Sequence, residues 1–264
     1  MRINAGKYRG RALRAPKGYE TRPTTDRVRE AEMNVITSAR QGFEGAVVLD
    51  AFAGTGALGL EALSRGADRA WFFETSGDAL RAINENVKKL GVPPQSVRIR
   101  KADVLAEPPV NARPPFDIVF LDPPYAFDPE AVLGLVAALA RGGALAPDVI
   151  VMYEHEVQAN EAAEAAAAAC GLALARRKHY GDTIVDTLRL ASWAEEAEAA
   201  EDADEEEDAG EDAWADAREL SDADEHAGAG GFASAEGAPA PAPAPASETP
   251  ASAPADSDER KDER

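Results

Sequence analysis

Short apolar runs alternate with amphipathic stretches over the first 191 residues of the chain. Seven of the runs have strand length and are rich in β-branched or aromatic residues: 47–50, 71–74, 97–100, 116–121, 149–154, 172–180 and 183–191. Helical periodicity fills most of the intervals, at residues 60–65, 78–90, 129–139 and 159–169. Alternating strands and helices predict one α/β domain with a mostly parallel, seven-stranded sheet and helices on both faces.

Both ends of this domain have their own pattern. Gly181-Asp182 separates the last two runs and predicts that they close the sheet as an antiparallel pair. Thr24 or Asp26 can cap a first helix, whose apolar stripe includes Val28, Ala31 and Val35. Residues 1–24 form a separate basic segment, in which glycines and prolines predict a small hairpin or an extended arm.

The run at 116–121 stops abruptly at Asp122-Pro123-Pro124-Tyr125. Proline fixes φ and has no N–H, so this loop keeps its geometry before a ligand arrives. The loop offers a carboxylate, backbone carbonyls and an aromatic ring, which together suit a flat molecule that carries an amino group. A proline turn that merely ends a strand is the plainer interpretation, and this stretch alone leaves both open.

A glycine-rich turn follows the run at 47–50. Gly54, Gly56 and Gly59 permit a tight turn and a close approach to a ligand at a helix N-terminus. Glu74 ends the next run, 18 residues after Gly56, where a parallel nucleotide-binding fold places a carboxylate on ribose hydroxyls. Taken alone, this pattern also fits a nicotinamide-dependent dehydrogenase.

Two features favour a ligand other than a nicotinamide dinucleotide. Asp50 precedes the glycine-rich turn, which also contains Phe52, and its carboxylate would repel a pyrophosphate but attract an amine or a sulfonium cation. The loop at Asp122 has no role in hydride transfer. Asp50, Glu74, Asp103 and Asp122 all follow predicted strands, so we expect the four acids to meet at the ligand-binding edge of the sheet.

The charge of the chain is unevenly distributed. Residues 1–193 carry 24 Lys and Arg against 24 Asp and Glu, whereas residues 194–264 carry 4 against 24, which accounts for the formal net charge of −20. Nine cations lie in residues 1–29 against Glu20 and Asp26, a local charge of +7. Tyrosines among these cations could stack on bases where phosphates are neutralised, although a solvated N-terminus is equally compatible with the composition. The acidic average therefore does not exclude a nucleic-acid partner.

The rest of the composition narrows the class of protein to which the chain can belong. A single cysteine, Cys170, excludes an intramolecular disulfide, and the three histidines lack ligand spacing, so we expect no metal. No run is long enough for a membrane span, and we expect a cytoplasmic protein. Residues 194–264 are rich in Ala, Glu, Asp and Pro and predict a disordered acidic tail, either a passive solubilising one or one that competes for the basic segment.

The motifs together resemble S-adenosylmethionine-dependent methyltransferases that act on exocyclic amines. Four blocks are similar, in order, to the bacterial RsmD family, which methylates guanine N2 in 16S ribosomal RNA: residues 1–11, 21–30, 52–67 and 180–183. The similarity covers residues 1 to about 192. It implies a Rossmann-like class I methyltransferase fold over residues 25–193 and S-adenosyl-L-methionine as cofactor. It also implies a partner, 16S rRNA within a 30S subunit or assembly intermediate, with guanine 966 as the expected target.

The resemblance also implies roles for individual residues. Asp50 and the turn at 54–56 would hold the methionine portion of the cofactor, Glu74 the ribose hydroxyls and Asp103 the adenine amine. The whole cofactor set is Asp50, Phe52, Gly54, Thr55, Gly56, Glu74, Thr75, Ala102, Asp103 and Val104.

The catalytic set is Asp122, Pro123 and Tyr125. Asp122 and the Pro123 carbonyl would accept hydrogen bonds from the guanine amine, and Tyr125 would stack on the base. The predicted RNA-binding set is Arg2, Lys7, Tyr8, Arg9, Arg11, Arg22, Arg27 and Arg29. Methylation of a different amine, in DNA adenine or protein glutamine, and a non-catalytic RNA-binding module remain as alternatives.

Overall fold

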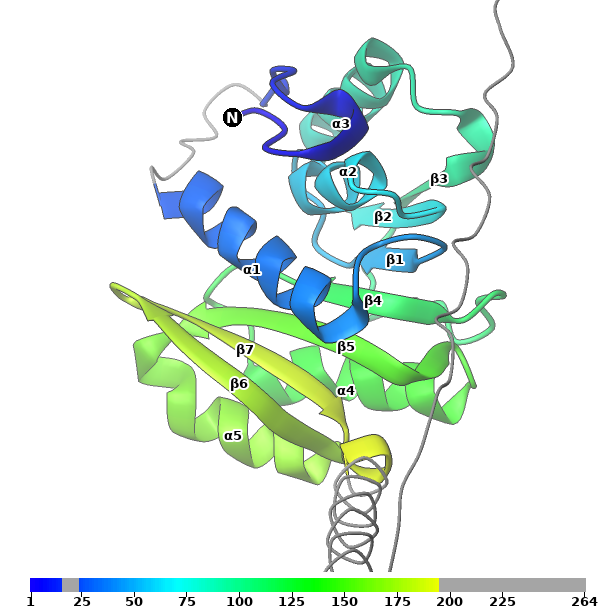
Figure 1. Cartoon of the computed structure of the whole chain (residues 1–264). Helices are drawn as coiled ribbons and strands as arrows, with labels where there is room; N and C mark the ends of the chain where they lie inside the picture. Colours follow the sequence, from blue (N-terminus) through cyan, green and yellow to red (C-terminus); the bar gives the residue numbers. More distant parts are fainter. Residues whose placement is uncertain (16–23, 195–264) are drawn as a thin grey trace, which may run out of the picture. The chain divides into compact units, whose positions relative to one another are not determined.

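The computed structural model describes residues 1–15 and 24–194 of the chain. Within these residues one seven-stranded sheet has the order β3-β2-β1-β4-β5-β7-β6 (Figure 1). The strands are β1 (Val47–Asp50), β2 (Arg69–Glu74), β3 (Val97–Lys101), β4 (Phe116–Leu121), β5 (Leu145–Glu156), β6 (Leu172–Tyr180) and β7 (Thr183–Leu190). All pairings are parallel except those of β7, which runs antiparallel to β5 and β6. The predicted class I fold is confirmed.

Helices cover both faces of this sheet (Figure 1). They are α1 (Thr24–Arg40), α2 (Ala57–Ser64), α3 (Gly77–Leu90), α4 (Pro129–Arg141) and α5 (Asn160–Ala169), with short 3₁₀ turns at Gly6–Tyr8, Pro94–Ser96 and Val157–Ala159. Side chains of β1 show how one strand serves two cores. Val48 packs with α1, α2 and α3, whereas Val47 and Leu49 pack with α4 and α5. A strand buried on both faces reads as a continuous apolar run, which is why the sequence located β1 so clearly.

The strand order changes direction between β1 and β4, because the chain first builds β1, β2 and β3 outward and then returns to the other side of β1. Ligands bind beyond the carboxyl ends of the strands at such a switch point. The loops after β1 and β4 therefore open onto a common space, and β1 and β4 pair directly through Leu49 and Val119.

One predicted boundary is wrong at α2. The sequence analysis placed Gly59 in the turn, but α2 already begins at Ala57. A Cβ at Gly59 would lie 2.4 Å from Cε1 of Phe72, so this glycine is needed for close packing of α2 on β2 and not for a turn. Gly56 is the residue with positive φ, at 76°, immediately before the helix.

The basic N-terminal segment is folded onto the domain over its described residues. Arg2 and Ala12 form an antiparallel bridge, and Gly10 N–H donates to the Ile3 carbonyl at 2.8 Å. Ile3, Tyr8 and Leu13 are buried in the core that contains α1, α2 and α3. The segment is thus anchored by apolar side chains while most of its cations remain outside. Residues 16–23 and the predicted tail beyond Ala194 lie outside the described residues.

Candidate active site

A cavity of about 640 Å³ lies at the carboxyl ends of β1, β2 and β4. This volume is in the range of small-molecule and cofactor sites. The four acids predicted to meet at this edge all line it: Asp50, Glu74, Asp103 and Asp122. The other predicted residues on its wall are Phe52, Gly54, Thr55, Thr75, Ala102, Val104, Pro123 and Tyr125, whereas Gly56 is not part of the wall. One space therefore joins the glycine-rich turn to the Asp-Pro-Pro-Tyr loop.

Asp50 is a buried acid at the base of this cavity, and its side chain is only 2% exposed. Its Oδ2 atom accepts the Gly59 N–H of α2 at 3.0 Å. Burial raises the pKa of Asp50 to about 7; the Gly59 hydrogen bond lowers it, and the carboxylates of Asp122 and Glu74 raise it. A cation placed beside Asp50 would favour the ionised form, so this wall fits the positively charged amino-acid end of S-adenosylmethionine.

Glu74 fastens the glycine-rich turn to the end of β2. Its Oε2 atom accepts the Gly54 N–H at 2.8 Å, and its Oε1 atom accepts the N–H groups of Thr75 and Ser76, each at 2.7 Å. A carboxylate has about four lone-pair sites, so these three hydrogen bonds leave about one site for a ribose hydroxyl. Glu74 consequently shapes the turn and fits the predicted ribose role at the same time.

Asp103 follows β3 on the same wall. Its Oδ1 atom accepts the Leu105 N–H at 2.9 Å, which fixes the loop that carries the buried Val104. The Ala102 N–H donates to the Glu74 carbonyl at 3.2 Å, so this loop is held beside the end of β2. An acid next to a buried apolar side chain suits the amine and the ring of adenine.

The Asp-Pro-Pro-Tyr loop forms the opposite wall. Asp122 is exposed at its mouth and Pro123 is buried. The Tyr125 hydroxyl and Thr183 Oγ1, at the start of β7, are 2.9 Å apart and share a hydrogen bond. This contact fixes the phenol end of Tyr125, and it gives a structural reason for the block at residues 180–183 that the sequence comparison singled out.

The cavity wall also holds residues outside the predicted sets, among them Glu32, Phe127 and Glu154. Phe127 is 39% exposed and meets Phe52 edge-on, with ring centroids 5.8 Å apart. Because Phe127 follows Tyr125 by only two residues, the sequence could have predicted that it lies on the cavity wall. Glu32 interrupts the apolar stripe of α1 between Val28 and Ile36, and an acid at a core-facing helical position is a signal that the periodicity contained.

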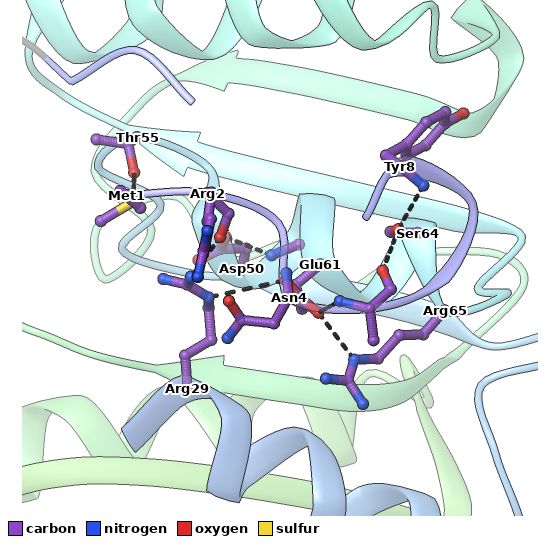
Figure 2. Close-up of polar contacts among 12 residues, drawn as sticks. Met1, Arg2, Asn4, Tyr8, Arg29, Asp50, Thr55, Glu61, Ser64 and Arg65 are labelled. Atoms are coloured by element: carbon purple, nitrogen blue, oxygen red, sulfur yellow. Dashed lines mark hydrogen bonds and ion pairs between the residues drawn. The ribbon is translucent and has the colours of Figure 1, made fainter. Parts of the chain in front are cut away.

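The basic segment docks on α2 (Figure 2), and its first residue, Met1, lines the cavity. The N–H groups of Asn4 and Ala5 donate to the buried Glu61 carboxylate at 2.8 and 3.0 Å, and Arg65 Nε donates to it at 2.9 Å. Further along, the Tyr8 N–H donates to Ser64 Oγ at 2.9 Å. These contacts place the segment's backbone, so its exposed cations have a defined position relative to the site.

Two members of the predicted RNA-binding set are interior residues, which corrects that prediction. Tyr8 is 5% exposed because its ring packs into the core, so it has no face free for a base. Arg29 is 3% exposed, and its Nη2 atom donates to the Arg2 carbonyl at 2.7 Å, which ties α1 to the segment. The exposed members are Arg2, Lys7, Arg9, Arg11 and Arg27; Arg22 lies outside the described residues. Arg11 also donates to the Leu90 carbonyl at 2.9 Å.

No group of three or more His, Cys, Asp or Glu side chains among the described residues is arranged to hold a metal ion. None of the helices in that part of the chain is long and apolar enough to cross a membrane.

Known structures identify the class of protein. The solved structure of the Escherichia coli protein yhhF matches with a TM-score of 0.58 and 31% sequence identity, over 72% of this chain and 97% of that one. This match, together with the sheet order and the antiparallel β7 of the present chain, defines a class I S-adenosylmethionine-dependent methyltransferase.

Sequence comparison then gives the family. A family model described as "Conserved hypothetical protein 95" matches residues 1–189. Bacillus subtilis YlbH is 32% identical over 184 residues, which are 69% of this chain and 95% of YlbH. The ribosomal RNA small subunit methyltransferase D of Haemophilus influenzae is 34% identical over 160 residues, 59% of this chain and 79% of that protein. The chain belongs to this family, the RsmD family, as its motifs indicated.

Proposed function

We propose that this methyltransferase modifies the exocyclic N2 of one guanine in 16S ribosomal RNA, with guanine 966 as the expected target. The observation that carries the proposal is that the acids suited to the cofactor and the Asp-Pro-Pro-Tyr loop line one cavity, with a docked basic segment beside it. The name of the Haemophilus influenzae relative, a small-subunit ribosomal RNA methyltransferase, supports the choice of RNA.

In this proposal, the residues that hold the cofactor and the residues that hold the substrate amine lie on two different walls of the cavity. Asp50, Glu74 and Asp103 would hold S-adenosylmethionine, which supplies an electrophilic methyl group on a sulfonium sulfur. Asp122 and the Pro123 carbonyl would accept hydrogen bonds from the guanine amine and turn its nitrogen toward that methyl. The nitrogen lone pair of this amine is delocalised into the ring, so alignment and compensation of developing positive charge must supply most of the rate enhancement.

The target guanine must leave its stack to reach the loop. Enzymes that modify bases act on unpaired or flipped nucleotides, and Tyr125, whose hydroxyl is hydrogen-bonded to Thr183, would stack on such a base. The natural substrate is therefore a guanine in an RNA loop, presented by a 30S subunit or an assembly intermediate.

The proposal is tested by supplying labelled S-adenosylmethionine together with 30S subunits, naked 16S RNA or double-stranded DNA, and then mapping the label. We expect label on N2 of a single guanine of 16S RNA. Label on adenine in DNA or on a glutamine side chain would contradict the proposed substrate while leaving the methyltransferase class intact.

The exposed cations of the basic segment should grip RNA phosphates without touching the cofactor. We expect Lys7→Ala combined with Arg9→Ala to weaken RNA binding and to reduce the slope of log K against log salt by about 1.4 to 1.8. Cofactor affinity should not change. Fluorescence anisotropy with labelled RNA at several salt concentrations measures the slope.

Arg141→Ala is the matched control for this experiment, because Arg141 is an exposed cation at the end of α4, away from the carboxyl ends of the strands. It should leave the slope unchanged. An unaltered slope in the double variant would remove Lys7 and Arg9 from the RNA contact.

A further inference from the structure

Glu32 on α1 is a buried acid that the roles assigned so far do not use. Its side chain is 5% exposed, and it lines the cavity together with Asp122 and Glu154. Val28 and Ile36, one turn away on either side, are fully buried in the core, so the helix places Glu32 on its core-facing stripe. An apolar residue would satisfy the packing of α1 at this position.

The side chain of Glu32 lines the cavity that the substrate amine must enter. Burying an acid on the core-facing stripe of a helix is unfavourable for its ionised form, so a glutamate at this position calls for a functional explanation. That explanation is sought in the chemistry of the cavity, where Glu32 shares the wall with Asp122.

Groups from several elements surround Glu32. Glu154 at the end of β5, Asp122 after β4, Asp50 at the end of β1 and Arg29 on α1 act on it electrostatically, and Tyr180 of β6 is itself influenced by Glu32. Burial raises the pKa of Glu32 well above its usual value of 4.5; Glu154, Asp122 and Asp50 raise it further, and only Arg29 lowers it. Glu154 and Asp122, the two acids with the largest effect on Glu32, line the same cavity as Glu32 does.

We propose that Glu32 accepts the proton that the target amine loses during methyl transfer, by way of Asp122 or a water molecule. This inference rests on the proposed function. In the step, the amine nitrogen bonds to the methyl carbon as the carbon–sulfur bond breaks, and the bonding electron pair stays on sulfur. The methylated nitrogen is then cationic and releases one proton to the carboxylate of Glu32, which becomes neutral.

The charges of the cavity favour this direction of transfer. Before the step, a sulfonium cation near the acidic wall stabilises ionised carboxylates. Methyl transfer removes that positive charge, so the proton affinity of the buried carboxyl rises when the proton must be accepted. Asp122 is exposed and would contact the amine, whereas Glu32 is buried and its pKa is raised, so Glu32 is the better final acceptor. Glu32 is in this sense a positioning and proton-accepting residue that acts through Asp122 or water.

The test compares the full-length wild type with Glu32→Gln and Glu32→Leu in single-turnover methyl transfer at saturating cofactor and RNA between pH 5 and pH 8. The wild-type rate should fall as the pH is lowered through this range. Both variants should be slower by roughly 100-fold. Their rates should not show the wild-type decrease at low pH, which is the acid limb of the pH profile. Glu30→Gln, which removes an exposed carboxylate from the same helix, should behave as the wild type.

A second measurement needs no RNA. A carboxyl whose pKa is raised by folding stabilises the protein at low pH and loses that contribution as the pH rises toward its folded value. The melting temperature of Glu32→Gln should therefore exceed that of the wild type by more at pH 8 than at pH 5. This comparison also shows that the variants are folded.

The outcomes separate the two proposals. A Glu32→Gln variant with the wild-type rate overturns the role of Glu32, as does a slow variant that keeps the wild-type acid limb, because a purely structural defect would leave the pH profile unchanged. If the wild type methylates no RNA, the proposed function fails, and the melting comparison then tests the environment of Glu32 by itself.

Discussion

Asp122→Ala should reduce methyl transfer by roughly 1000-fold, about 4 kcal/mol of lost transition-state stabilisation, while the protein still binds S-adenosylmethionine. The carboxylate is exposed on the cavity wall and belongs to the loop after β4, whereas the turn that fits the cofactor follows β1. Its proposed work is done on the amine, where it aligns the nitrogen and compensates the charge that develops there. The loss should therefore appear in kcat and not in cofactor affinity.

Asp122→Asn separates charge from shape in the same position. The amide keeps one acceptor oxygen but removes the negative charge, so we expect most of the rate loss of Asp122→Ala to remain. Glu130→Gln, an exposed carboxylate in the first turn of α4, is the control and should have the wild-type rate. Single-turnover rates together with calorimetric titration of the cofactor measure both quantities. Near-normal turnover of Asp122→Asn would show that the charge has no part in the reaction.

Asp50→Asn should weaken binding of S-adenosylmethionine by about 30-fold, about 2 kcal/mol, because a buried carboxylate facing a cationic ligand is replaced by a neutral amide. The new side chain can still accept the Gly59 N–H, so the turn should keep its geometry. Adenosine carries the ribose and adenine without the cationic methionine portion, and its affinity should be unaffected. Calorimetric titration of both ligands provides the comparison.

The same residue predicts a pH dependence of cofactor binding. The pKa of Asp50 is raised to about 7, so its carboxyl is increasingly protonated below neutral pH. A cationic ligand prefers the ionised form, and affinity should consequently fall as the pH decreases from 8 to 6. In Asp50→Asn this dependence should be much weaker. An equal pH dependence in the variant and the wild type would place the cation away from Asp50.

Much of the fold was readable because the central strands are buried on both faces. Continuous apolar runs predicted β1 and β4, and the acids that end β1 and β2 or follow β3 and β4 predicted the position of the cavity. Parallel strands deliver their carboxyl ends to one edge, so residues remote in sequence could be expected to meet there.

Other features depend on packing that local sequence does not express. Gly59 resembles a turn glycine by spacing, and only its contact with Phe72 shows that it serves helix packing. Tyr8 and Arg29 lie among basic residues and look suited to RNA, but both are used to attach the segment to α1 and α2. The sequence shows Glu32 only as an acid within the apolar stripe of α1, and the fold shows that this acid lines the cavity.

A crystal structure with S-adenosylhomocysteine bound would show whether one cavity presents a guanine amine to the methyl-bearing sulfur of the cofactor. We expect the homocysteine portion beside Asp50, the ribose at Glu74, and the sulfur facing the Asp-Pro-Pro-Tyr loop across a gap that admits one amino group. A cofactor bound elsewhere, or with its sulfur turned away from Asp122, would rule out this arrangement.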